Sequence, residues 1–136
     1  GFMLKDNHRA ALERAGVELA AAVRSARQRL PEGVIVTIEV DDLEQIPEAL
    51  SAGADSILLD NMTPGQLAAA VARIDGTART EASGGITLAS IRAVAESGVD
   101  VISVGALTHS APALDVALDF DWEAGPGPAP EELDGG

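Results

Sequence analysis

The sequence has no cysteine and no tyrosine, and its aromatic residues are two phenylalanines and one tryptophan. Without cysteine, disulfides, thiolate catalysis and zinc–sulfur sites are excluded. The chain has 136 residues, of which 46% are hydrophobic, and these are mostly Ala, Val, Leu and Ile. This is enough for one domain with a real core and too little for two. Such small side chains suit helices packed on a β-branched sheet.

Basic residues are also scarce, with 9 Lys and Arg against 22 Asp and Glu, which gives a net charge of −13. We expect neither nucleic acid nor an anionic membrane as a partner, because an acidic body repels both. The same field repels phosphorylated substrates unless local groups overcome it. No apolar run reaches the roughly 18 residues of a membrane-spanning helix, and no signal peptide is visible. We therefore expect a cytoplasmic protein.

Strand-like and helix-like segments alternate along the chain. Helical spacing of apolar residues extends over 9–30, and the β-branched run at 34–40 predicts a strand. Thr63-Pro64 predicts a helix start, with proline in the first turn. We predict further strands at 56–59, 79–82 and 101–104, the end of a strand at 2–5, and helices at 42–52, from 63, and at 87–97. Asp42 with Gln45 is expected to form a capping box at the first of these helices, and Thr87 to cap the last.

An internal repeat supports a parallel sheet. Residues 52–57 and 97–102 share the pattern small-Gly-x-Asp-x-Ile, in which the glycine is expected to end a helix in the left-handed conformation. Two turns of one design predict repeated βα units. The fold class is therefore α/β, a partial (truncated) TIM-like βα barrel with parallel strands, since a complete barrel needs more strands. We assign residues 1–122 to this barrel and 123–136 to a disordered acidic Pro/Gly-rich tail.

Two glycine loops are candidates for phosphate binding. Ser83, Gly84 and Gly85 follow one predicted strand, and Gly105 and Ala106 follow the next. Glycine lets backbone N–H groups approach a phosphate closely, and the helix that follows adds its dipole. A plain tight turn is the alternative for either loop alone. Paired loops after neighbouring barrel strands favour a phosphate site.

Two carboxylates lie near the ends of predicted strands, Glu39 in the run at 34–40 and Asp60 directly after Leu59. Carboxylates are rarely buried in a strand unless they are paired or bind a cation. Facing one mouth, they would suit Mg²⁺ or would stabilise positive charge at a sugar carbon. The alternative for Glu39 is a helix-facing position paired with an arginine. Lys5 is a point-charge donor that is uninformative alone, and His8 and His109 lack the partners of a zinc site.

The blocks that contain these residues resemble successive blocks of the quinolinate phosphoribosyltransferase family. They appear in the family's order and cover about residues 2–120. The blocks are 3–8 (MLKDNH), 39–41 (EVD), 58–61 (LLDN), 81–85 (EASGG) and 103–110 (SVGALTHS).

The resemblance implies an enzyme that converts quinolinate and phosphoribosyl pyrophosphate into nicotinate mononucleotide, CO₂ and pyrophosphate with Mg²⁺. It implies that Lys5 holds the quinolinate carboxylates, and that Glu39 and Asp60 face the ribose and the magnesium pyrophosphate. The resemblance also implies that the full-length enzyme is a homodimer. The residues implied to surround the 5′-phosphate are Ser83, Gly84, Gly85, Gly105 and Ala106, with His109 nearby.

One departure from the family concerns the basic groups. By this resemblance we expect the family's N-terminal domain and early barrel strands to be missing, and with them an arginine- and lysine-rich set that serves the two substrate carboxylates and the pyrophosphate. A second departure is Thr37, which stands where many relatives have a second inward carboxylate. The leading hypothesis is therefore an enzyme fragment that is inactive alone. One alternative is a non-catalytic phosphate-binding half-barrel that needs a separate N-terminal partner. Another is a different phosphate-binding barrel, such as a thiamine-phosphate or molybdenum-associated relative.

Overall fold

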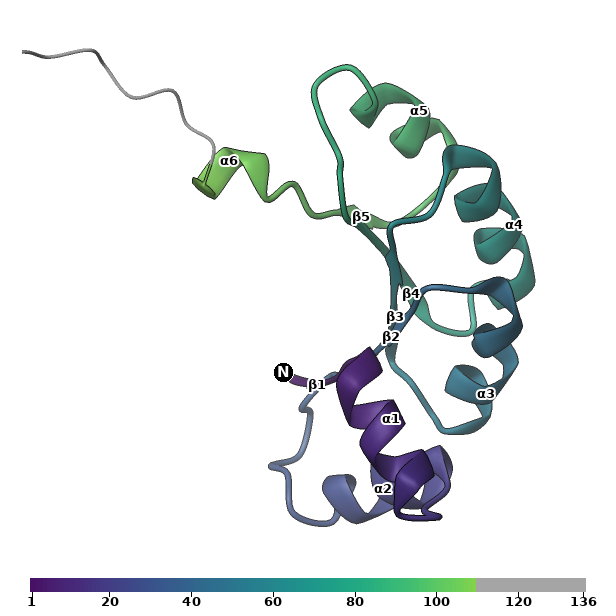
Figure 1. Ribbon diagram of the computed structural model, residues 1–136, viewed down its shortest axis with the longest axis vertical. Coiled ribbons are helices and arrows are strands. Elements are labelled where there is room, and N and C mark those ends of the chain that lie inside the picture. The colour runs from purple at the N-terminus through teal and green to yellow at the C-terminus, as the bar shows by residue number, and fades with distance from the viewer. Residues whose placement is uncertain (110–136) are drawn as a thin grey trace, which may run out of the picture.

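A computed structural model describes residues 1–109 and shows five parallel strands in one sheet. The strands lie in chain order, each beside its sequence neighbour, as expected of successive right-handed βα units (Figure 1). This confirms the predicted α/β class, and the arrangement is that of a partial barrel. The strands are β1 (Phe2–Leu4), β2 (Val36–Val40), β3 (Ser56–Asp60), β4 (Arg79–Ser83) and β5 (Val101–Ile102).

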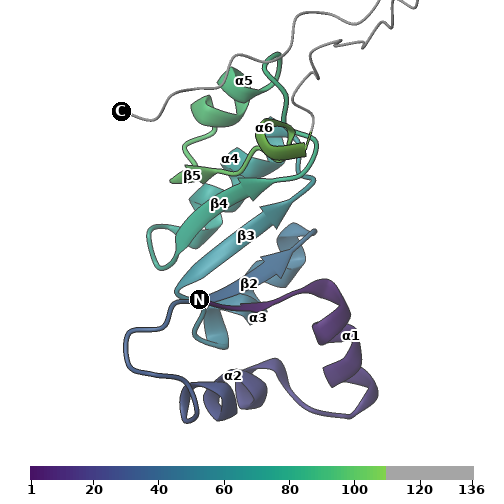
Figure 2. The same cartoon turned by 90° about the vertical axis from the view of Figure 1, so that its left-hand side faces the viewer.

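Helices follow the strands and cover one face of the sheet. In Figure 1 α3, α4 and α5 lie along the same side of the sheet, and in Figure 2 α3 and α4 lie behind the strands. The opposite face, which we call the open face, has the short α6 at its β5 end (Figures 1 and 2). Among residues 1–109 none of the helices combines the length and apolar character needed to cross a bilayer. The helices are α1 (Asp6–Arg14), α2 (Leu19–Arg27), the 3₁₀ turn η1 (Leu43–Gln45), α3 (Ile46–Ser51), α4 (Pro64–Ile74), α5 (Ile91–Glu96) and α6 (Ala106–His109).

The core lies between the sheet and these helices. Along β2 buried residues alternate with half-buried ones, so Val36, Ile38 and Val40 face the helices. Ile57 and Leu59 of β3 extend the same layer, and all five side chains are fully or almost fully buried. Burying such a side chain stabilises the fold by about 1.5–3 kcal/mol. The alternation therefore fixes which side chains point to the open face.

The internal repeat corresponds to two equivalent helix-to-strand turns, as predicted. Gly53 and Gly98 both adopt left-handed φ values, of 85° and 88°. The aspartate two residues after each glycine accepts a hydrogen bond from the backbone of the preceding strand. Asp55 Oδ2 accepts from Val36 N at 2.8 Å, and Asp100 Oδ2 accepts from Thr80 N at 2.7 Å. Each aspartate thus holds two neighbouring strands together at their amino ends.

The prediction of one helix over 9–30 was wrong, because the chain forms two helices there. α1 ends at Arg14, and Gly16 follows in the left-handed conformation with φ 64°. Val17 N then donates to Leu12 O at 2.9 Å, which closes the helix end. The apolar spacing continues through this break, so periodicity alone did not reveal it.

Of the two predicted caps, Asp42 is confirmed as an N-cap but without Gln45 as its capping-box partner, and the cap at Thr87 was wrong. Asp42 accepts from Glu44 N at the start of η1, while the Gln45 side chain bonds to Asp41 instead of returning to Asp42. Thr87 precedes a turn, and α5 begins only at Ile91. By contrast, the predicted start at Thr63 is confirmed by a capping box with Gln66. The last predicted strand is shorter than expected, Val101–Ile102. Residues 110–136, including the predicted tail at 123–136, lie outside the described chain.

Candidate active site

The carboxyl ends of the parallel strands meet at one edge of the sheet, where barrel active sites form. Glu39 of β2 is in register with Leu58 of β3, and Leu58 with Glu81 of β4. Since the neighbouring Ile38 faces the helices, Glu39 and Glu81 lie on the open face, one on each side of Leu58. Two residues further along, and so on the same face, Asp60 is in register with Ser83. Acids and hydroxyls therefore share this face.

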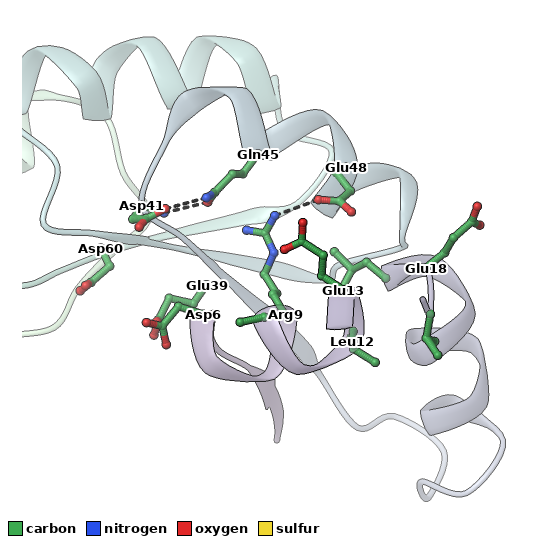
Figure 3. Close-up of a pocket in the computed structure, with 13 residues that line it drawn as sticks. Asp6, Arg9, Leu12, Glu13, Glu18, Glu39, Asp41, Gln45, Glu48 and Asp60 are labelled. Carbon is green, nitrogen blue, oxygen red and sulfur yellow. Dashed lines mark hydrogen bonds and ion pairs between the residues drawn. The ribbon is translucent and has the colours of Figure 1, made fainter. Parts of the chain in front are cut away.

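An acidic pocket of about 520 Å³ lies between this edge and α1 (Figure 3). Its described lining holds seven carboxylates against one guanidinium, that of Arg9. Glu39 and Asp60 both line it and come from adjacent strands. The two acids predicted to share one mouth are thus brought together. The lining charges are Asp6, Arg9, Glu13, Glu18, Glu39, Asp41, Glu48 and Asp60.

The pocket's single guanidinium already has a partner. Arg9 Nη2 lies 2.8 Å from Glu48 Oε2, and the Arg9 side chain is only 19% exposed (Figure 3). No described residue forms an ion pair with Glu39, so the alternative of a helix-facing Glu39 paired with an arginine was wrong. Asp60 Oδ2 accepts a hydrogen bond from Asn61 Nδ2 at 2.6 Å. The Glu39 and Asp60 carboxylates therefore face the pocket without a neutralising base from the described chain.

The acids of this pocket can bind a cation only together with other ligands, such as water or substrate oxygens. Among residues 1–109 no group of three or more carboxylate or histidine side chains converges on one metal position. Mg²⁺ commonly binds through one or two carboxylates, retained waters and substrate phosphates. Glu39 and Asp60 have the right donor chemistry for such a shared site.

A second pocket, which we call the glycine pocket, measures about 530 Å³ and brings the two glycine loops together. Gly84 and Gly85 adopt left-handed φ values of 89° and 59°. The expected dipole of a helix opening at Gly85 is not present, because α5 starts at Ile91; α6 does start directly after Gly105. The pocket therefore offers mainly backbone and hydroxyl groups. Its lining is Ser83, Gly84, Gly85, Ile86, Thr87, Ser103, Gly105 and Ala106.

Asn61 lines neither pocket but is hydrogen-bonded to one lining residue of each, Asp60 and Ser83, a connection that the sequence did not reveal. It is one of two described non-glycine residues with positive φ, 53°. Its N–H donates to Ser83 O at 2.9 Å, and its side chain bonds to Asp60. A Cβ added to Gly84 would lie 2.2 Å from Asn61 Oδ1. The signal in the sequence was an Asn directly after a strand end, since Asn tolerates the left-handed region.

Glu81 lies in the block 81–85 noted in the sequence, but sequence reasoning gave it no role in the site. Its Oε1 accepts a hydrogen bond from Ser103 Oγ at 2.5 Å, which links β4 to the chain beyond β5. Ser103 also lines the glycine pocket. Alternation in β4 places Glu81 and Ser83 on one face, and this was the available signal. Because β4 is mostly polar, its sequence alone did not show which face points to the site.

Lys5 is not brought into either pocket. Lys5 is exposed at the N-cap of α1, where its backbone N–H donates to His8 Nδ1 at 3.1 Å. This bond gives His8 a capping role. His109 is the last residue of α6, four residues after Gly105. The described lining of neither pocket includes Lys5.

Comparison with known families matches this geometry to one of them. The model of the quinolinate phosphoribosyl transferase C-terminal domain matches residues 1–119. The chain belongs to the quinolinate phosphoribosyltransferase family. The match spans both pockets and every predicted site residue, so the resemblance noted in the sequence is confirmed.

Individual relatives agree with the family match. The chain is 41% identical over 119 residues to a probable nicotinate-nucleotide pyrophosphorylase [carboxylating] of Bacillus subtilis. That alignment covers 88% of this chain and 40% of the relative. The structure of the nicotinate-nucleotide pyrophosphorylase of Francisella tularensis matches with a TM-score of 0.69 and 37% identity, covering 79% of this chain and 37% of the other. The chain therefore spans about 40% of the length of these relatives.

A thiamine phosphate pyrophosphorylase from Pyrococcus furiosus is also similar in structure, with a TM-score of 0.59, 23% identity and coverage of 76% of this chain and 48% of the other. At that identity the likeness shows the shared βα fold alone. The alternative of a thiamine-phosphate barrel thus receives no support beyond the fold, whereas the quinolinate family matches in sequence as well.

Proposed function

We propose that this chain supplies the acidic and glycine pockets of a quinolinate phosphoribosyltransferase. The reaction joins quinolinate to phosphoribosyl pyrophosphate and yields nicotinate mononucleotide, CO₂ and pyrophosphate. One observation carries the proposal: two carboxylates and two glycine loops lie at the same edge of a parallel sheet, in adjoining pockets linked by Asn61.

The glycine pocket is proposed to hold the 5-phosphate of phosphoribosyl pyrophosphate. The backbone N–H groups of Gly84, Gly85, Gly105 and Ala106 are the donors, joined by the Ser83 hydroxyl. Such groups bind a phosphate without adding a mobile positive charge. His109 is proposed to lie near this anion as part of α6.

Glu39 and Asp60 are proposed to act at the sugar carbon. Displacement of pyrophosphate builds positive charge there, and fixed carboxylates in a water-poor site stabilise that charge. Positioning and charge suffice for this step, because the incoming ring nitrogen is itself the nucleophile. Bound Mg²⁺ would supply positive charge for the departing pyrophosphate. Glu39 and Asp60 would bind this Mg²⁺, and oxygens of the substrate would complete its coordination.

Quinolinate and phosphoribosyl pyrophosphate are both polyanions, which the acidic pocket repels. The only guanidinium in its described lining is engaged by Glu48. Further positive charge must therefore come from Lys5, from Mg²⁺ and from basic groups beyond the residues described here. We propose that the chain by itself has no measurable turnover, and that the active enzyme is a cytoplasmic homodimer, in keeping with the family resemblance.

A second candidate is a phosphate-binding module without catalysis. It rests on the glycine pocket, whose geometry does not need the acids. The two functions differ in what the acids do: only the enzyme requires Glu39 and Asp60.

A chimera separates the two functions. Residues 1–119 of this chain replace the matching region of the Bacillus subtilis relative, and formation of nicotinate mononucleotide is measured by chromatography. The proposal expects activity from the chimera and background from the isolated chain. A folded chimera that binds phosphate but gives no product, while the unaltered relative turns over, would favour the non-catalytic module.

A further inference from the structure

Asn61 sits at a strained and unusually connected point of the fold. It follows β3 directly, and its φ of 53° places it in the left-handed region. A non-glycine residue there is uncommon and persists where its surroundings fix it. Within the described chain only Asp75, with φ 46°, shares this feature, and it caps the far end of α4.

Three contacts of Asn61 reach both pockets. Its Nδ2 donates to Asp60 Oδ2 at 2.6 Å, in the acidic pocket. Its backbone N–H donates to Ser83 O at 2.9 Å, in the glycine pocket. Its amide group packs against Gly84 so closely that a Cβ on Gly84 would lie 2.6 Å from Asn61 Cγ and 2.8 Å from Asn61 N.

We infer that Asn61 is a positioning residue that couples the Asp60 carboxylate to the Ser83-Gly84-Gly85 loop, so that an anion bound at the loop fixes the orientation of the acid. This rests on the proposed phosphate role of the glycine pocket. The carbonyl of Ser83 and the α-carbon of Gly84 can shift only if Asn61 shifts with them. Since the Asn61 amide holds one oxygen of Asp60, the other oxygen is left free to face the pocket.

The coupling has a chemical purpose. A phosphorylated sugar spans a fixed distance between its phosphate and its reacting carbon. If one residue sets the spacing of the phosphate loop and the acid, anchoring the phosphate also places the carboxylate against that carbon. Small displacements at such a site are costly in rate, because the acid must be aligned before the charge develops.

The test uses the 136-residue chain and inorganic phosphate as the probe. Backbone amide signals of Gly84 and Gly85, and the ¹³C signal of the Asp60 carboxylate, are followed by NMR during a phosphate titration. The inference expects all three signals to move with one dissociation constant. If the glycine signals move and the Asp60 signal stays still, the phosphate site stands and the coupling is wrong. If no glycine signal moves, the phosphate site itself fails and the coupling with it.

Asn61→Gly provides the decisive variant, because glycine keeps the left-handed backbone and removes the side chain. We expect the phosphate dissociation constant to rise about fivefold, which corresponds to about 1 kcal/mol, and the Asp60 response to disappear. An unchanged Asp60 response in this variant would overturn the coupling.

Asp75→Gly is the matched control, since it relieves the same backbone strain at the C-cap of α4, where the described hydrogen bond of Asp75 goes to Val71 O and to no residue of either pocket. It is expected to leave the dissociation constant and the Asp60 response as they are. If Asp75→Gly weakened both to the same degree, the effect of Asn61→Gly would be a general loss of rigidity and the inference would fail. The wild-type titration decides the question even if a variant does not fold.

Discussion

Gly84 packs so closely against Asn61 that a Cβ at position 84 would lie 2.2 Å from Oδ1 of Asn61. This contact is far inside the limit for nonbonded atoms, and φ at Gly84 is 89°. A glycine is thus required here by the neighbouring loop, whatever binds in the pocket. Nothing lies within 4 Å of a Cβ built on the adjacent Gly85. The two glycines of one motif are therefore constrained for different reasons.

Gly84→Ala is predicted to lower the free energy of unfolding by about 2–4 kcal/mol, from steric overlap with Asn61 and a strained φ together. Gly85→Ala, which meets open space, is predicted to cost only about 1 kcal/mol through its φ of 59°. Urea unfolding followed by circular dichroism measures both. Equal losses at the two positions would contradict the close contact with Asn61.

Glu39→Gln is predicted to lower kcat of the chimera described above by about 100-fold, since the neutral amide cannot balance charge at the sugar carbon. The urea midpoint should not fall, because Glu39 makes no described ion pair. Its neutralisation also removes one negative charge from a pocket lined by seven carboxylates, which lowers their mutual repulsion. Glu13→Gln is the control: it neutralises another acid of the same pocket that also makes no described ion pair, and it lies on α1, away from Asp60 (Figure 3). A kcat loss as large in the control would show a general charge effect and no specific role of Glu39.

Glu81→Gln keeps the size of the side chain and weakens its hydrogen bond from Ser103. Hydrogen bonds to a charged acceptor are worth about 1.5–3 kcal/mol, so the cost should reach about 1 kcal/mol after screening at this half-buried site. We expect KM for phosphoribosyl pyrophosphate in the chimera to rise, because Ser103 lines the glycine pocket. An unchanged KM and stability would show that the contact does not shape the pocket.

The aspartates of the internal repeat predict a pH dependence of stability. The backbone N–H of Val36 lowers the pKa of Asp55, assisted by Arg27, although partial burial opposes the shift. A lowered folded-state pKa means that the contribution to stability is complete above the unfolded value of about 3.9 and is lost as pH falls through the folded value.

Asp55→Asn is accordingly predicted to cost about 1 kcal/mol at neutral pH, a modest value because water screens a carboxylate that is 38% exposed. The difference between wild type and variant should shrink below about pH 4. Chemical unfolding at pH 7 and pH 3 tests this. A difference that stays constant across that range would show that the charge of Asp55 has no part in holding β2 to β3.

Much of the fold followed from local sequence chemistry. The turns at Gly53 and Gly98 were predictable because small-Gly-x-Asp-x-Ile specifies both the left-handed glycine and the strand that follows. The start of α4 was predictable because Thr63 and Gln66 form a cap within a single turn. The break at Gly16 was not, because an isolated glycine within an apolar period does not by itself reveal a helix end.

The site was predictable at the level of strand ends and no further. Glu39 and Asp60 share a pocket because their strands are adjacent, which follows from chain order in a parallel sheet. The role of Asn61 depends on a backbone angle and on a loop 22 residues away in sequence, at Ser83. No local pattern encodes that distance. Lys5, which stands out only by resemblance, is exposed and outside both pocket linings.

The most direct test of the account is an NMR titration of the chain with phosphoribosyl pyrophosphate and Mg²⁺, following the amides of Gly84 and Gly85 with the carboxylates of Glu39 and Asp60. If one molecule occupies both pockets, all four signals should respond with a single dissociation constant. Responses confined to one pocket, or found only on the helix-covered side of the sheet, would contradict it.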